Sequence, residues 1–330
     1  MRFSSLRAVT PPDASPLTRA ANLGDATAIT PLSGGRNNRV FRVDTAAGTP
    51  ALLKSYFHSE ADPRDRLAHE AGFTAFAVDR GLPQVPRLLG QDRARRIALF
   101  SFVEGRMLEP SEVDAARVGE TIDFFVSLNR HRDSDIAAAL PLGSEACLCT
   151  LEHLALTDGR IRGLDAIGDP AAAAFIEGEL KPRWAALHMP MAKRDDAMAP
   201  APRCLSPSDF GFHNALLDHA TDRLVFHDFE YAGWDDPAKV LGDFYHQPRR
   251  PAPRDTLDAF LAATADVLDL DAEARDRIRR LLPVYAFKWA CIVLGPLLPA
   301  AAERRRFAGE PDPDPGALAE QARALITRSR

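Results

Sequence analysis

The sequence predicts an α+β fold of two lobes, in which an antiparallel sheet with one main helix precedes a mostly helical lobe. Short apolar runs separated by turn residues fill residues 26–103, a pattern typical of strands. Longer segments with helical spacing of their apolar residues fill most of the remainder. A chain of 330 residues is long enough for two lobes around a cleft. We therefore expect lobes at residues 1–103 and 104–330.

The elements follow from local signals. The first lobe should hold strands near 27–33, 38–44, 50–56, 85–90 and 95–101, and one helix near 63–80. Asp62 and Pro63 favour a start for that helix, since Asp caps it and Pro fits the first turn. Ser111 and Asp114 resemble a capping box that opens a helix to about residue 130. Further helices are expected near 168–190, 237–246, 254–268, 272–295 and 315–328.

Composition narrows the class of partner. A hydrophobic fraction of 46% with 26% charged residues is ordinary for a globular protein. A net charge of −5 gives no basic field that could attract a nucleic acid or an anionic membrane, so we expect neither as a partner. The start Met1–Arg7 has no apolar core of signal length, which favours a cytoplasmic protein.

Two further features bear on membranes and metals. The apolar stretch Leu281–Ala302 approaches membrane-spanning length, but Lys288 and prolines interrupt it, so a buried helix over Val284–Gly295 is the better interpretation. The cysteines lack the paired C-x-x-C spacing of a zinc site and are expected as reduced thiols. They are Cys147, Cys149, Cys204 and Cys291.

A glycine-containing turn lies between the first two expected strands. Gly34 and Gly35 let backbone N–H groups approach phosphate oxygens, because no Cβ stands in the way. Taken alone, a plain hairpin turn is the commoner explanation of such a pair.

One lysine and one glutamate come next. Lys54 lies inside the apolar run Ala51–Tyr56, where an ammonium group needs an anionic partner. Glu70, in the middle of the following helix, can supply it. Alone, Lys54 is more simply a strand residue that reaches solvent, and Glu70 a solvated helix charge. A lysine on a strand paired with a glutamate on the next helix positions nucleotide phosphates in kinases.

The richest stretch is Leu205–Leu217, followed by Val225–Tyr231. It contains Asp209, Asn214 and Asp228 between apolar runs, and the runs before and after residues 218–223 indicate a hairpin. A hairpin would return Asn214 and Asp228 to one end of a small sheet. Kinase-type phosphoryl transfer needs such a set, an Asp to accept a hydroxyl proton and an Asn with a second Asp to hold Mg²⁺.

These residues resemble a known superfamily of small-molecule kinases with a protein-kinase-like fold, that of aminoglycoside phosphotransferases and choline kinases. The family's signature, His-Gly-Asp with Asn five residues after the Asp, is matched by Pro207-Ser208-Asp209 and Asn214. Its Asp-Trp/Phe-Glu segment is matched by Asp228-Phe229-Glu230. The resemblance extends from about Leu32 to about Tyr245.

The resemblance implies roles for these positions. Asp209 would be the catalytic proton acceptor, and Asn214 and Asp228 would hold Mg²⁺. ATP, or GTP, would be bound by Lys54 with Glu70, by the turn at Gly34 and Gly35, and by the backbone of the interlobe linker. In this family the linker binds adenine, which points to Ser101 and Val103 within residues 101–105.

Two departures concern the catalytic loop. Pro207 stands where the family has a buttressing His, and Val240 stands where the pattern Asp-Pro-Ala-x-Asp has its last Asp. Asp243 is expected to take over the buttressing role. The proton acceptor and the metal ligands are unchanged.

We therefore expect an ATP-dependent or GTP-dependent phosphotransferase acting on a hydroxyl of a small polar molecule. Glu230, Trp234 and Asp235 would suit a cationic acceptor such as an aminoglycoside, an amino sugar or a choline-like molecule, through ion pairs and cation–π contacts. Equally, Trp234 could pack and Asp236 could cap the next helix, which leaves a neutral sugar open. The alternative function is a silent nucleotide-binding regulator, which Pro207 suggests and the intact Lys54 and Asp209 oppose.

Overall fold

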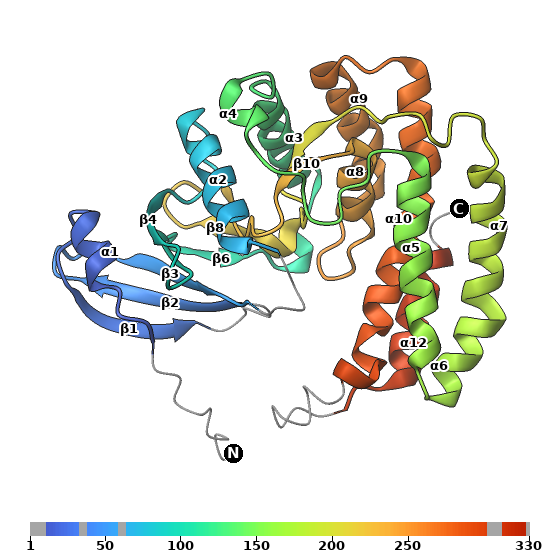
Figure 1. The fold of residues 1–330 in the computed structure, drawn as a ribbon, viewed down its shortest axis with the longest axis horizontal. Helices are drawn as coiled ribbons and strands as arrows, with labels where there is room; N and C mark the ends of the chain where they lie inside the picture. Colours follow the sequence, from blue (N-terminus) through green and yellow to red (C-terminus); the bar gives the residue numbers. More distant parts are fainter. Residues whose placement is uncertain (1–10, 33–37, 59–63, 302–311, 328–330) are drawn as a thin grey trace. The chain divides into compact units, whose positions relative to one another are not determined.

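The computed structural model describes residues 11–32, 38–58, 64–301 and 312–327. The chain packs as two compact units. The first unit comprises residues 1–107, 134–141 and 214–232, and the second comprises 108–133, 142–213 and 233–330. The predicted α+β class is confirmed, since strands dominate the first unit and helices the second (Figure 1).

A five-stranded antiparallel sheet forms the centre of the first unit, in the order β1-β2-β3-β5-β4. Its strands are β1 Ala26–Leu32, β2 Asn38–Thr45, β3 Ala51–Tyr56, β4 Leu88–Asp92 and β5 Ile97–Ser101. β4 begins three residues later than expected, because Pro86 lacks the N–H that a ladder needs.

One helix packs against each face of this sheet (Figure 1). Leu17 of α1, Ser15–Ala20, joins the apolar cluster on one face, with Phe41 and Leu53. Leu67 of α2, Arg66–Asp79, joins Tyr56 and other apolar residues on the opposite face. The second face therefore carries both the helix and the even-numbered positions of β3, which include residue 54.

The expected hairpin is present, and it belongs to the first unit. β8, Ala215–Asp218, pairs with β9, Leu224–Phe226, and also with β6, Gly105–Met107. The segment 214–232 was expected in the second lobe with everything beyond residue 103, but its packing differs because β6 and β8 share one small sheet. The first unit also holds the short helix α4, Asp135–Ala138.

Helices make up most of the second unit, with one two-stranded sheet of β7, Cys204–Ser206, and β10, Gly233–Asp235. α3 begins at Ala115, because Asp114 accepts the Arg117 N–H at 2.9 Å, so the expected start at Ser111 is corrected. The helices are α3 Ala115–Asn129, α5 Thr150–Gly163, α6 Pro170–Phe175, α7 Lys181–Ala192, α8 Pro237–His246, α9 Leu257–Leu268, α10 Ala272–Leu294 and α12 Pro315–Thr327.

α8 is buried along its whole length. At its middle, Gly242 lies against the ring of Tyr285 on α10, and a Cβ at that position would be 2.1 Å from a ring carbon. Glycine therefore allows the two helices to approach closely.

α10 matches the helix expected near 272–295 and begins well before the buried segment expected at Val284–Gly295, because Pro283 lies inside the helix without ending it. With the turn that follows, it is long and apolar enough to cross a membrane, yet 61% of its most apolar stretch is buried within the protein. Arg277 and Lys288 on this helix form buried ion pairs with Asp236 and Asp243. These features are those of a core helix.

Candidate active site

Lys54 is the centre of a buried charge cluster in the first unit. It lies on β3, opposite Val40 of β2 and Ala98 of β5. Its Nζ donates to Glu70 Oε2 at 2.6 Å and also to a carboxylate oxygen of Asp228. The structure therefore brings together three residues that are far apart in the sequence and that the motif analysis had selected.

α2 presents Glu70 to this lysine. Asp65 caps the helix by accepting the Ala68 N–H at 3.0 Å, and the expected start at residues 62 and 63 lies outside the described residues. Tyr56 donates its hydroxyl to the Glu70 oxygen that Lys54 also binds, at 2.7 Å. Two donors thus fix one carboxylate.

The charge on Lys54 is stabilised by its surroundings. Burial alone lowers its pKa, but the negative charges of Glu70 and Asp228 outweigh that effect and raise the pKa above the ordinary value. The lysine therefore stays protonated at neutral pH and remains a cation for an anionic ligand.

One face of α2 also contacts the segment 228–232. The contacting positions are spaced three or four residues apart, as on a single helical face. The contacts join Arg66 Nε to Glu230 Oε2 at 3.7 Å, His69 Nδ1 to the Ala232 carbonyl at 2.8 Å, and the Phe73 ring to the Phe229 ring at 5.0 Å between centroids. α2 therefore positions both Glu70 and the segment that carries Asp228.

Asn214 and Asp228 lie at one end of the β8–β9 hairpin, as expected. Ala215 pairs with Phe226, and the His227 N–H donates to the Asn214 carbonyl at 3.0 Å. Asp228 has a φ of +66°, a left-handed conformation that is rare for a residue other than glycine. Its side chain is 36% exposed. Its carboxylate is therefore both held by Lys54 and open to solvent.

Asp209 belongs to the second unit. Its carboxylate lies 3.0 Å from His213 Nε2, and its side chain is 38% exposed. His213 was missed at the sequence level, although its place directly before Asn214 was a visible signal. The residue before Asp209, Ser208, has a φ of +67°, so strained backbone occurs next to the predicted proton acceptor as well as at Asp228, the predicted metal ligand.

Asp243 does not reach the catalytic loop through any direct contact that the structure describes. It binds Lys288 at 2.9 Å and Lys239 at 3.2 Å, and it is Lys239 that reaches Ser208 Oγ, at 3.2 Å. The expected buttressing by Asp243 is thus indirect. Sequence reasoning missed Lys239, since a single Lys in a helix is usually a solvated charge.

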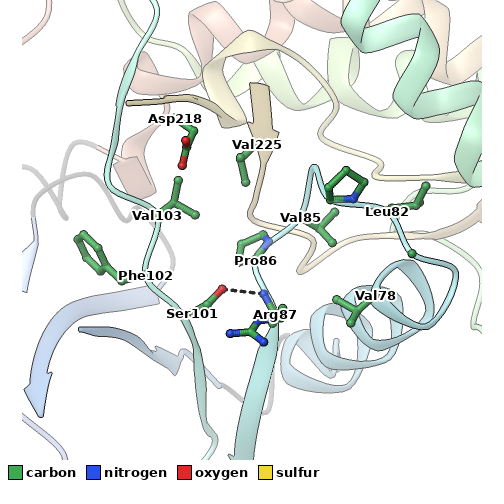
Figure 2. Close-up of a pocket in the computed structure, with 12 residues that line it drawn as sticks. Val78, Leu82, Val85, Pro86, Arg87, Ser101, Phe102, Val103, Asp218 and Val225 are labelled. Carbon is green, nitrogen blue, oxygen red and sulfur yellow. Dashed lines mark hydrogen bonds between the residues drawn. The ribbon is translucent and has the colours of Figure 1, made fainter. Parts of the chain in front are cut away.

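Ser101 and Val103 line a cavity of about 400 Å³ in the first unit (Figure 2). Other walls come from Val78, Leu82 and Val225. Ser101 Oγ accepts the Arg87 N–H at 2.8 Å, which fixes the linker at its start. The size suits a small molecule, but Lys54, Glu70 and Asp228 are not among the lining residues. The walls of this cavity therefore include the linker and none of the three residues of the charge cluster.

The remaining predicted site residues have other environments. Glu230 is buried and accepts a hydrogen bond from Asn38. Asp235 is buried and accepts the Cys147 N–H at 3.2 Å. Both carboxylates are thus engaged inside the protein, and their binding of an acceptor stays a prediction. Trp234 lies half-buried on β10, opposite Leu205.

The alternative for Asp236 is confirmed, since it caps α8 by accepting the Ala238 N–H at 2.7 Å. Gly34 and Gly35 lie outside the described residues. The four cysteines are free thiols, and burial raises the pKa of Cys147 and of Cys291 to about 12.

The donor set at the hairpin end fits a magnesium ion. Asn214 offers an amide oxygen and Asp228 a carboxylate, and both are hard donors of the kind Mg²⁺ prefers. Mg²⁺ commonly takes one or two protein ligands and completes its shell with phosphate oxygens and water. The partial exposure of Asp228 leaves room for such a ligand.

Comparisons with known proteins identify the family and the fold of the chain. A model of the phosphotransferase enzyme family matches residues 28–281. A choline/ethanolamine kinase family protein from Mesorhizobium loti is 20% identical, with a TM-score of 0.58, and the match covers 92% of this chain and 90% of that one. A spectinomycin phosphotransferase, solved with ADP and spectinomycin, is 14% identical, with a TM-score of 0.60 and coverage of 97% and 99%.

A choline kinase from Streptococcus pneumoniae is 15% identical, with a TM-score of 0.58 and coverage of 94% and 96%. At such identities these likenesses show that the chain shares the fold of these kinases and phosphotransferases. No curated protein matches the chain by sequence.

Proposed function

The chain belongs to the phosphotransferase enzyme family, and on that premise we propose that it transfers the γ-phosphoryl group of ATP, or of GTP, to a hydroxyl of a small polar molecule. The observation that carries this proposal is the convergence of Glu70 and Asp228 on Lys54. A buried lysine clamped by a helix glutamate, next to a partly exposed aspartate, suits an anionic ligand that arrives with a cation.

Each residue has a distinct task in this mechanism. Lys54, oriented by Glu70, binds the α- and β-phosphates. Asp209 orients the acceptor hydroxyl and takes its proton. The acceptor oxygen forms its bond to the γ-phosphorus while the bond from that phosphorus to the β-bridging oxygen breaks, which releases ADP or GDP. Positioning and electrostatic stabilisation supply most of the rate enhancement.

Asn214 and Asp228 would hold Mg²⁺, which when bound neutralises charge on the phosphate oxygens. Lys54 keeps one Asp228 oxygen in place, so the carboxylate is oriented before any metal arrives. The turn at residues 34 and 35 is proposed to cover the phosphates, and Ser101 and Val103 to bind the base through their backbone.

The acceptor class is proposed more broadly than a cation, since Glu230 and Asp235 are buried and already bound within the protein. An aminoglycoside, an amino sugar, a choline-like molecule and a neutral sugar all carry the required hydroxyl. Because ATP is the proposed donor, we also propose a cytoplasmic location.

Mg-dependent ATP turnover against a panel of these hydroxyl acceptors tests the proposal. The change Asp209→Asn preserves shape and the hydrogen bond from His213 but removes the base, so turnover should fall about 10²–10⁴-fold while nucleotide affinity persists. Asp222→Asn, at the exposed tip of the hairpin, is the matched control and should change neither. Full activity of Asp209→Asn would remove that residue from the mechanism, and nucleotide binding without turnover in the unaltered protein would favour the silent regulator.

A further inference from the structure

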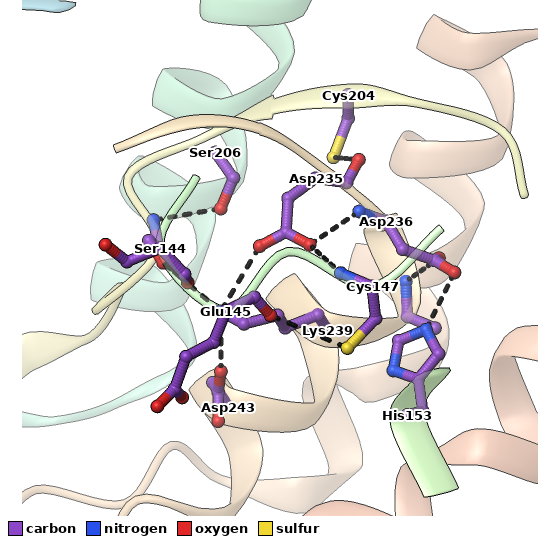
Figure 3. Close-up of polar contacts among 12 residues, drawn as sticks. Ser144, Glu145, Cys147, His153, Cys204, Ser206, Asp235, Asp236, Lys239 and Asp243 are labelled. Carbon is purple, nitrogen blue, oxygen red and sulfur yellow. Dashed lines mark hydrogen bonds and ion pairs between the residues drawn. The ribbon is translucent and has the colours of Figure 1, made fainter. Parts of the chain in front are cut away.

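We propose that Lys239 is a positioning residue that, through Ser208, holds the strained turn from which Asp209 is presented. The role of Asp209 rests on the proposed function, but the restraint on the turn does not. The residues involved lie within the second unit. Figure 3 shows Lys239 near Asp235 and Asp243.

The turn itself is a high-energy piece of backbone. The Asp209 N–H donates to the Pro207 carbonyl at 3.0 Å, which closes a three-residue turn around Ser208. The φ of +67° at Ser208 makes this the rarer and more strained form of such a turn. A residue with a side chain keeps that conformation only where its surroundings hold it.

Three hydrogen bonds hold Ser208. Its N–H donates to Ser206 Oγ at 2.9 Å, and its own Oγ donates to the Ser144 carbonyl at 3.3 Å. The same Oγ accepts from Lys239 Nζ at 3.2 Å. The last bond has a charged donor, and bonds of that kind are the strongest.

Lys239 is itself immobilised. Its Nζ lies 3.2 Å from Asp235 Oδ2 and 3.2 Å from Asp243 Oδ2, and the side chain is 2% exposed. Burial lowers its pKa, but the two carboxylates raise the pKa above the ordinary value, so the ammonium group stays charged and donates. A fixed, charged donor therefore meets the hydroxyl of Ser208.

The chain of charges continues away from the loop. Asp243 also accepts from Lys288 at 2.9 Å and from Trp289 Nε1 at 2.9 Å. Asp235 accepts the Asp236 N–H at 2.8 Å, which ties it to the first turn of α8. Helices α8 and α10 and strand β10 thereby act on Ser208 through one side chain.

Removing only the hydroxyl tests the restraint. In Ser208→Ala, Lys239 keeps both carboxylate partners, so the fold should survive. In Ser208→Gly the hydroxyl is also lost, but the positive φ is no longer strained. The control is Thr121→Val, which removes a buried hydroxyl that donates within α3 to the Arg117 carbonyl at 3.0 Å.

Two readouts separate positioning from general stability. Hydrogen–deuterium exchange of the amides in residues 204–213 should be about 10-fold faster in Ser208→Ala, while exchange in α5 and α9 stays as in the unaltered protein. With an acceptor in hand, kcat should fall about 10- to 100-fold, because the hydroxyl loses its hydrogen bond from the charged Lys239 as well as its bond to the Ser144 carbonyl, with KM for ATP unchanged. Thr121→Val should show neither effect.

The Ser208→Gly variant separates the effect of backbone strain from the effect of the lost hydroxyl. It should melt at a higher temperature than Ser208→Ala because strain is relieved, yet its kcat should be equally low because the anchor is missing. If Ser208→Ala keeps both normal exchange and normal kcat, Lys239 is only a core residue and the proposal is overturned. If exchange rises but the unaltered protein turns over no nucleotide, the restraint stands and the proposed function fails.

Discussion

Lys54 on β3 and Lys239 on α8 are both buried, and each binds two carboxylates, but the two clusters differ in balance and exposure. Around Lys54, one positive charge faces Glu70 and Asp228, and Asp228 is 36% exposed. Lys239 and Lys288 together face Asp235 and Asp243, and none of these four side chains exceeds 6% exposure. Glu145, which is 35% exposed, lies 4.0 Å from Lys288 and is itself paired with Arg160.

This difference distinguishes a cluster that can bind a ligand from one that stabilises the fold. An open cluster with an excess of negative charge can still gain from a bound cation and its anionic ligand. A cluster in which each carboxylate is already paired with a cation gains less from a further ligand, and it fixes the elements that contribute to it. Burial of a lysine therefore does not by itself mark a ligand site; the unmatched, exposed partner does.

The largest expected effect contrasts the two lysines directly. Lys239→Met should lower the free energy of unfolding by about 3–5 kcal/mol, because the buried Asp235 loses the ammonium group that pairs with it, whereas Asp243 keeps Lys288. Lys54→Met should lose about 1–2 kcal/mol, since burial already raises the pKa of Glu70 and lets it take up a proton. Urea unfolding of both variants measures this, and equal losses would break the comparison.

The next largest effect is that of acidic pH on stability, through a buried histidine on α8. Burial, aided by the positive charge of Arg254 and opposed by Asp243, lowers the pKa of His246 on α8 to about 4. The unfolded chain therefore binds the extra proton first, and stability falls as pH drops from about 6.5 towards 4. The loss from this group is about 3 kcal/mol. Thermal unfolding against pH should show it, and His246→Gln should flatten the curve in that window.

A smaller effect concerns the open cluster. Lys54→Met should raise KM for ATP or lower kcat, and Glu70→Gln should do so more weakly. Because both act through one ion pair at 2.6 Å, the double variant should be less impaired than the product of the singles, with a coupling of about 1–2 kcal/mol. Independent effects of the two changes would separate Glu70 from nucleotide binding.

The smallest effect uses matched helix caps. Asp65 caps α2 and Asp271 caps α10, each by accepting one backbone N–H. Replacing either by Ala should lower the free energy of unfolding by about 1 kcal/mol. Only Asp65→Ala should also weaken ADP binding in calorimetry, because α2 carries Glu70. A loss of binding in both variants would mean that stability alone accounts for it.

Sequence alone predicted the elements whose structure depends on residues close together in the chain. The strand around Lys54, the helix around Glu70 and the hairpin between Asn214 and Asp228 each follow from local alternation, spacing and turn residues. The pairing of Lys54 with Glu70 could be anticipated because a buried ammonium group needs an anion, and the next helix offered one.

Sequence alone did not predict the features that depend on contacts between segments far apart in the chain. Lys239 is buried only because β7, β10 and α10 surround α8, and a lone lysine between Ala238 and Val240 gives no sign of that. The helix α5 was not predicted, because its many polar residues leave only a weak helical spacing of the apolar ones. Glu230 and Asp235 looked like surface carboxylates near a metal ligand, but Asn38 and Lys239 engage them within the core.

The complete burial of α8 has a consequence for how the chain tolerates change. Most helices leave one side in solvent, where substitution is nearly free, so a saturation scan shows tolerance that recurs every three or four positions. All ten residues of Pro237–His246 are buried, and Gly242 has no room for even a methyl group beside Tyr285. A scan should therefore find that substitutions are poorly tolerated at all consecutive positions of this helix, because no side of it faces solvent.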